Sequence, residues 1–162
     1  MRIVLAEDEA LLREGLRVLL EHVGHDVVAS VSTATELLHA VRRADPAAPP
    51  DIVITDVRMP PGRSDDGLRA AIELRRDHPR LPILLLSQYL GNEYLRRLLD
   101  SAEDDPHSGG VGYLLKDRVA HVQELTQALQ TVACGGVVVD RKVITALMRN
   151  EEIGRASCRE RV

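Results

Sequence analysis

Continuously apolar segments alternate along the chain with segments in which apolar residues recur at helical spacing. The first kind is expected of strands covered on both faces of a parallel sheet. The predicted strands are Ile3–Ala6, Val27–Val31, Ile52–Asp56, Pro82–Ser87 and Val111–Leu115. The predicted helices are Leu11–Val23, Ser32–Val41, Leu68–Arg75, Asn92–Ala102 and Val119–Val132. Predicted strands and helices therefore alternate over most of the chain.

This alternation predicts an α/β fold, a doubly wound five-stranded parallel sheet with helices on both faces. Right-handed crossovers leave few topologies, and the common one for five strands is the flavodoxin-like order 2-1-3-4-5. We expect one folded domain over residues 1–133, followed by a short extension over 134–150. The extension contains a brief extended piece at Val137–Val139 and a short helix at Lys142–Arg149.

Residues 151–162 lack apolar periodicity, and we predict a disordered tail there. The tail is either a remnant of an expression vector or a natural linker.

Composition excludes several classes of function. The chain of 162 residues is 44% hydrophobic and carries a net charge of −4, so this part has no basic nucleic-acid footprint. Cys134 and Cys158 are too few for a disulfide framework and have no zinc-site spacing. No apolar run approaches the roughly 20 residues of a membrane span. We expect a cytoplasmic protein without a membrane partner.

Polar residues stand at the carboxyl ends of the first, third, fourth and fifth predicted strands. They are Glu7 and Asp8, then Asp56, Ser87 and Lys116. Each has an ordinary alternative, as a helix cap, a turn residue or a solvated end. However, the carboxyl ends of parallel strands meet at one edge of a sheet, where such folds bind their ligands. We therefore expect these side chains to converge.

Three carboxylates at one site repel one another unless a cation neutralises them. Oxygen ligands without His or Cys favour a hard ion, and Mg²⁺ suits such a set. Lys116 and Ser87 could hold phosphate oxygens, and a carboxylate such as Asp56 can attack phosphorus. These residues together predict phosphoryl transfer.

The motifs resemble those of the receiver domain of two-component response regulators, a CheY-like fold, over residues 1 to about 133. The resemblance is carried by Glu7-Asp8, Asp56 with Met59-Pro60, Leu85-Leu86-Ser87 and Tyr113-Leu114-Leu115-Lys116-Asp117. The Leu-Leu-Lys-Asp ending and the later Gly135-Gly136 are similar to the NarL/FixJ branch. In that branch a LuxR-type helix-turn-helix domain follows, and no such pattern follows residue 149 here.

The resemblance implies that Asp56 is the phosphoacceptor. Asp8, Asp56 and the backbone carbonyl of Arg58 would bind Mg²⁺ directly, and Glu7 through water. Ser87 would hold a phosphoryl oxygen.

Lys116 would hold a further phosphoryl oxygen. Ser87 and Tyr113 would form the conformational switch, with plain core packing as the alternative for Tyr113. The implied partners are a sensor histidine kinase, a second copy of the chain, and DNA only through a C-terminal domain absent here.

Two departures affect these expectations. The loop from Pro60 to Gly67 is longer than the family's usual one, and the segment 92–112 is long and acidic where the switch face is expected. We expect a phosphorylation-switched receiver of a transcriptional regulator, which is not an enzyme beyond the Mg²⁺-dependent phosphorylation and dephosphorylation of its own chain. The alternative is a stand-alone receiver that shuttles phosphate or binds a partner. An aspartate-based phosphohydrolase is disfavoured because Arg58 stands where its general acid is needed.

Overall fold

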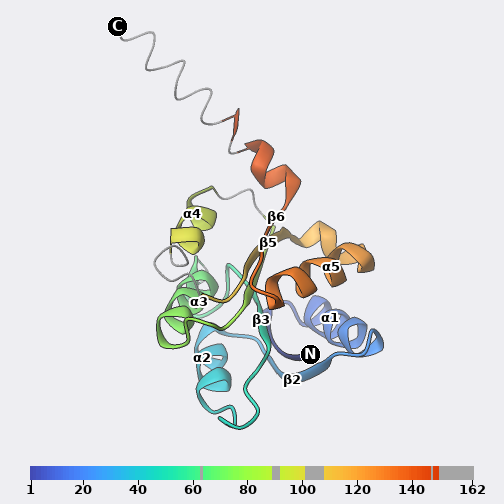
Figure 1. The fold of residues 1–162 in the computed structure, drawn as a ribbon, viewed down its shortest axis with the longest axis vertical. Coiled ribbons are helices and arrows are strands. Elements are labelled where there is room, and N and C mark those ends of the chain that lie inside the picture. The colour runs from blue at the N-terminus through green and yellow to red at the C-terminus, as the bar shows by residue number, and fades with distance from the viewer. Residues whose placement is uncertain (63, 89–91, 101–107, 147, 150–162) are drawn as a thin grey trace, which may run out of the picture.

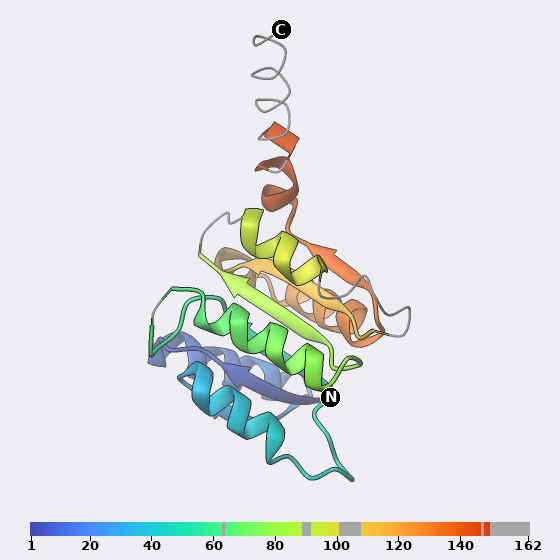
Figure 2. The ribbon, with the colours of Figure 1, turned by 90° about the vertical axis from the view of Figure 1, so that its left-hand side faces the viewer.

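A parallel sheet runs through the centre of the molecule, with helices on both of its faces (Figures 1 and 2). The computed structural model describes residues 1–62, 64–88, 92–100, 108–146 and 148–149. The strands are β1 Arg2–Ala6, β2 Asp26–Val31, β3 Ile52–Asp56, β4 Ile83–Ser87, β5 Val111–Leu115 and β6 Val137–Val139. The helices are α1 Ala10–His22, α2 Ala34–Arg42, α3 Asp66–Asp77, α4 Asn92–Asp100 and α5 Val122–Ala133, with a 3₁₀ helix, η1, at Lys116–Ala120.

The doubly wound fold is confirmed, but the prediction of five strands is wrong. Among the described residues the sheet has six strands in the order 2-1-3-4-5-6. The chain turns at Gly135, which has a positive φ of 93°, and β6 then pairs in parallel with β5. This short strand satisfies backbone groups that an edge strand at β5 would leave open. Its three valines alone do not reveal that pairing.

Two apolar clusters, one on each face of the sheet, make up the core. Val4 and Ala6 face α2, α3 and α4, whereas Ile3 and Leu5 face α1 and α5. Figure 1 shows these helices on opposite sides of the sheet. Every residue of β3, β4 and β5 is buried. Burial on both faces explains why these strands are continuously apolar in sequence.

Several predicted element boundaries differ from the observed ones. The fifth helix was expected from Val119, but residues 116–120 form η1 and α5 begins at Val122. Val119 lies in η1 and is buried. Its apolar side chain therefore fits the helical spacing of the buried residues in α5, although it precedes that helix. Residues 141–146 and 148–149 are helical, in agreement with the pattern over 142–149. Residues 101–102, the last two of the helix predicted from Asn92, lie outside the described residues. The predicted tail at 151–162 also lies outside them.

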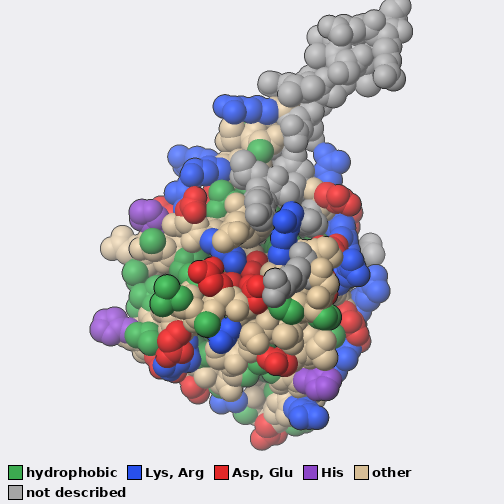
Figure 3. Space-filling view, turned by 180° about the vertical axis from the view of Figure 1, so that it is seen from behind, with side chains coloured by type: hydrophobic (Ala, Val, Ile, Leu, Met, Phe, Trp, Pro, Cys, Tyr) green, Lys and Arg blue, Asp and Glu red, His purple; other side chains and the backbone are tan. Residues whose placement is uncertain are grey.

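Acidic and basic side chains are interspersed on the face shown in Figure 3. No helix within the described ranges is long and apolar enough to cross a bilayer.

Candidate functional site

The strand order brings three carboxylates to one edge of the sheet. Glu7 and Asp8 directly follow β1, and Asp56 ends the neighbouring strand β3, whose Thr55 pairs with Ala6. One carboxylate oxygen from each of the three acids lies within 4.8 Å of the others. Glu7 and Asp56 are buried, whereas Asp8 is exposed.

Lys116 reaches the same place from the end of β5. Its Nζ donates to Asp56 Oδ2 at 2.9 Å and to Glu7 Oε1 at 3.0 Å. Its side chain is only 11% exposed. We call Glu7, Asp8, Asp56 and Lys116 the acidic site.

The acidic site carries more negative than positive charge. Burial, and then the nearby charge of Asp56, raises the pKa of Glu7 to about 7, although Lys116 opposes the shift. Burial also raises the pKa of Asp56 more than Lys116 lowers it. Burial would lower the pKa of Lys116, but its bonds to both carboxylates outweigh this effect and raise the pKa. One ammonium therefore does not neutralise these acids.

The acidic site has the donor set that a hard divalent cation requires. Its ligand atoms are all carboxylate oxygens, which suit Mg²⁺ or Ca²⁺ rather than a soft metal. In addition, Glu7 Oε2 is buried without a hydrogen-bond partner. A buried carboxylate oxygen normally has a partner, and a cation or its water would supply one.

A cavity of about 390 Å³ opens beside the acidic site. Its lining residues are Asp8, Glu9, Asp56, Arg58, Ser87, Gln88 and Lys116. Ser87 is the buried last residue of β4, and the Arg58 amide donates to Asp56 Oδ1 at 3.3 Å. The structure thus brings Ser87 and Arg58 to the predicted site. Sequence reasoning missed Glu9 and Gln88, whose only signal is that each adjoins a predicted site residue.

Gly67 was also missed as a residue that shapes the site. A Cβ added at Gly67 would lie 1.8 Å from the backbone oxygen of Asp56, and the Gly67 amide donates to Val57 O at 2.9 Å. Only glycine permits α3 to begin this close to β3. The sequence signal was a glycine at the first turn of a helix.

The long loop before α3 is fixed by an aspartate between two arginines. Asp65 Oδ1 accepts from Arg69 Nε at 2.7 Å, and its Oδ2 accepts from Arg97 Nη1 of α4 at 2.5 Å. Burial would raise the pKa of Asp65, but the guanidinium groups of Arg97 and Arg69 outweigh it and lower the pKa. We call Asp65, Arg69 and Arg97 the arginine tie.

Tyr113 lies on the other side of β5 from the α1–α5 cluster. Its side chain is fully buried in the cluster that faces α2, α3 and α4. Both core packing and a later switch movement are compatible with this position, so the switch role stays a prediction. Tyr89 and Tyr94 do not bear on it, since their side chains are outside the described residues.

Comparison with known sequences gives a consistent assignment. A model of the response regulator receiver domain matches residues 3–130. Oxygen regulatory protein NreC of Staphylococcus aureus strain JH9 is 32% identical over 158 residues, 97% of this chain and 65% of that protein. NreC of Staphylococcus haemolyticus is 34% identical over 149 residues, 91% of this chain and 62% of that protein. The chain thus spans slightly less than two thirds of these curated relatives.

Solved structures show the same fold. The isolated REC domain of RcsB from Salmonella enterica serovar Typhimurium, with phosphomimetic BeF₃⁻, has a TM-score of 0.69 at 24% identity, covering 90% of this chain and 96% of that one. A LuxR-family response regulator from Aurantimonas sp. SI85-9A1 has a TM-score of 0.72 at 23% identity, covering 93% and 96%. The chain belongs to the response regulator receiver domain family, and within it is similar to regulators of the NarL and LuxR type.

Proposed function

We propose that Asp56 is the phosphoacceptor of this receiver and takes its phosphoryl group from a histidine kinase in the presence of Mg²⁺. The observation that carries the proposal is the partly buried Lys116 ammonium, which contacts both Asp56 and Glu7 at the wall of an open cavity. A carboxylate beside a fixed cation and an incompletely neutralised acidic cluster is suited to phosphoryl transfer.

In the forward step, an Asp56 carboxylate oxygen attacks the phosphorus of the phosphohistidine. The P–N bond breaks, its electron pair stays on the imidazole of the kinase, and an acyl phosphate forms on Asp56. Asp8, Asp56 and the Arg58 carbonyl would hold a Mg²⁺ directly and Glu7 through water, and the ion would supply charge neutralisation. Lys116 turns from the carboxylates to a phosphoryl oxygen, and the Ser87 hydroxyl donates to another.

The acyl phosphate on Asp56 is then removed by hydrolysis. Water attacks phosphorus, the P–O bond to Asp56 breaks, and inorganic phosphate leaves as the carboxylate is restored. Arg58 lines the cavity where an aspartate-based phosphohydrolase needs a general acid. A guanidinium does not give up a proton at neutral pH, so we expect no turnover of external substrates.

We further propose that phosphorylation promotes homodimerisation through α1, α4 or α5, and that DNA is contacted by a domain outside this chain. A structure described as two RcsB dimers bound to two parallel DNAs is 25% identical, with a TM-score of 0.70, and this chain matches 68% of it. A cytoplasmic location follows from the kinase partner. Under the stand-alone alternative, the same reading frame would contain no helix-turn-helix sequence downstream.

The test is phosphorylation of the purified chain by acetyl phosphate with Mg²⁺, followed by intact mass. We expect one added phosphoryl group, which Asp56→Asn abolishes because the amide is not a nucleophile toward phosphorus. Asp51→Asn is the matched control, since Asp51 precedes β3 at its opposite end and accepts from the Arg2 amide at 2.7 Å. Unchanged phosphorylation of Asp56→Asn would assign the acceptor elsewhere.

A further inference from the structure

The unexpected sixth strand carries another acid to the edge of the sheet where Lys116 lies. Asp140 follows β6 directly, and its amide donates to the Tyr113 carbonyl of β5 at 2.8 Å. The residue is only 4% exposed. Asp140 lies beyond residues 3–130, the range that the receiver family matches.

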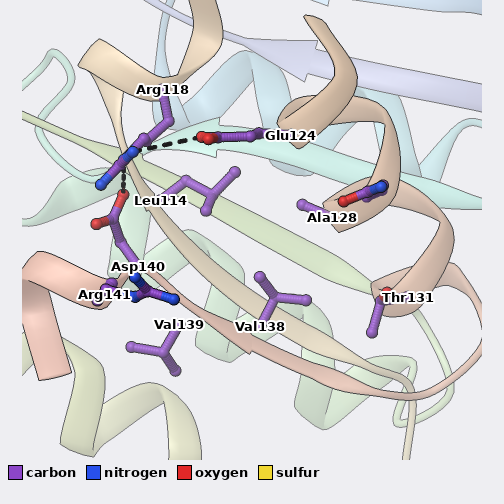
Figure 4. Close-up of a pocket in the computed structure, with 10 residues that line it drawn as sticks. Leu114, Arg118, Glu124, Ala128, Thr131, Val138, Val139, Asp140 and Arg141 are labelled. Atoms are coloured by element: carbon purple, nitrogen blue, oxygen red, sulfur yellow. Dashed lines mark hydrogen bonds and ion pairs between the residues drawn. The ribbon is translucent and has the colours of Figure 1, made fainter. Parts of the chain in front are cut away.

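The Asp140 carboxylate binds a backbone amide before Lys116 and a side chain after it. Its Oδ2 accepts from the Leu115 amide at 3.3 Å and from Arg118 Nε at 3.2 Å. Figure 4 shows Arg118 between Asp140 and Glu124, with the Asp140 side chain directed back toward η1. One carboxylate thus contacts the residue before Lys116 and the residue two positions after it.

Apart from the Lys116 ion pairs and the buried Val119, the segment that Asp140 holds is weakly restrained. Residues 116–120 form a 3₁₀ helix, whose hydrogen-bond geometry is poorer than that of an α-helix. Neither η1 nor α5 has a side-chain cap at its start. The side chain of Glu124, the second partner of Arg118, is 52% exposed, so its ion pair at 3.5 Å is a weak restraint. Asp140 is the more buried partner.

Asp140 also begins the C-terminal helix. Its Oδ1 accepts from the Lys142 amide at 3.0 Å, and its carbonyl accepts from the amides of Val143 and Ile144. Val143 is fully buried in the same core cluster as Tyr113. Capping alone needs one side-chain oxygen, which Ser supplies as well as Asp. The second oxygen is therefore available to act on the Lys116 segment.

We propose that Asp140 is a positioning residue for Lys116 and that it couples the helix beginning at Arg141 to the phosphorylation site. The proposal rests on the proposed function, because the role of Lys116 there is to hold a phosphoryl oxygen. Leu115 and Arg118, held by one carboxylate, set where the Lys116 ammonium lies. By linkage, a ligand that draws Lys116 toward itself shifts the equilibrium of the helix that Asp140 caps.

The test uses calorimetric titration of the whole chain, first with Mg²⁺ and then with beryllofluoride in saturating Mg²⁺. Asp140→Ser keeps an acceptor for the Lys142 amide and loses the second oxygen. Beryllofluoride binding is expected to weaken about five-fold or more, the lower range of coupling between sites. Mg²⁺ binding is expected not to weaken, since its proposed ligands are untouched. A merely structural role would weaken both.

Three further variants make the result specific. Asp45→Ser is the matched control, because Asp45 Oδ1 likewise accepts from the amide two residues on, at 2.9 Å, and should leave both titrations unchanged. Arg118→Gln leaves the cap intact and should give the same selective loss, even if Asp140→Ser folds poorly. In a Lys116→Ala background, Asp140→Ser should weaken beryllofluoride binding no further.

Equal beryllofluoride binding by the unsubstituted chain, Asp140→Ser and Arg118→Gln would overturn this inference alone. Equal weakening of both titrations, or an additive loss in the Lys116→Ala background, would also overturn it. If the unsubstituted chain binds no beryllofluoride, the proposed function fails and this inference fails with it.

Discussion

The acidic site and the arginine tie are each built around a buried aspartate, but their charge balance is opposite. In the acidic site carboxylates outnumber the single ammonium, and the pKa of Asp56 is raised by burial despite Lys116. In the tie, two guanidinium groups outweigh burial and lower the pKa of Asp65. Burial alone does not determine the pKa of a buried acid, because neighbouring charges oppose or reinforce the effect of burial. The first cluster can take up a cation, whereas the second is already neutralised.

The largest expected effect comes from removing the one cation of the acidic site. Lys116→Met leaves the buried carboxylates of Glu7 and Asp56 without their cation, and we expect the free energy of unfolding to fall by about 3 kcal/mol without divalent ions. Mg²⁺ should restore most of this loss, because a cation that binds only the folded protein stabilises it. Urea denaturation with and without Mg²⁺ measures both quantities.

Arg75 provides the control and the second prediction. Arg75 is 3% exposed, its guanidinium donates to carbonyls of the described residues, including Gly109 O at 3.0 Å, and burial lowers its pKa. Arg75→Met should lower the free energy of unfolding by about 2 kcal/mol, since buried carbonyls lose their donor. Here Mg²⁺ should restore nothing. Equal restoration in both variants would mean that Mg²⁺ acts away from the acidic site.

The difference between the two clusters also separates what sequence could predict from what it could not. Glu7 and Lys116 each follow a strand and Asp56 ends one, and parallel strands direct their carboxyl ends to one edge. Alternation and topology therefore locate the acidic site without any side-chain detail. The pair of Asp65 and Arg97 joins residues 32 positions apart on different elements. No local pattern marks such a contact.

The extended piece at Val137–Val139 was predicted, but its pairing with β5 was missed for a related reason. Val137–Val139 is too short to show a period, and its pairing depends on the turn at Gly135 returning the chain along β5. Asp140 then contacts Leu115, 25 positions earlier, only because that pairing exists. Asp140 makes these contacts because it lies beside β5, and its residue type alone does not reveal that position.

The third prediction tests whether the tie joins the loop to α4. A double-mutant cycle with Asp65→Asn and Arg97→Gln isolates the pair, and we expect a coupling of about 1 kcal/mol or less. The limit follows from exposure, since the Arg97 side chain is 37% exposed and that of Asp65 is 13% exposed. Urea denaturation of the four proteins gives the value.

The matching control for the tie is Arg69→Gln. Arg69 bonds the same carboxylate within one helix turn, but its side chain is 65% exposed, so its coupling to Asp65 should be smaller. A larger coupling for Arg69 than for Arg97 would show that Asp65 stabilises α3 alone. Zero coupling for both would remove the tie as a stabilising feature.

The smallest expected effect is the pH dependence of the tie. Because the folded pKa of Asp65 lies below its ordinary value of 3.8, its ionised form stabilises the folded state. This contribution is fully present above the unfolded pKa and is lost as pH falls through the folded pKa. The difference in unfolding free energy between the unsubstituted chain and Asp65→Asn should therefore shrink, by about 1 kcal/mol at most, from about pH 5 downward. Glu7, whose raised pKa has the opposite sign, is common to both proteins and cancels. A difference that stays constant with pH would mean that Asp65 acts through packing and not through its charge.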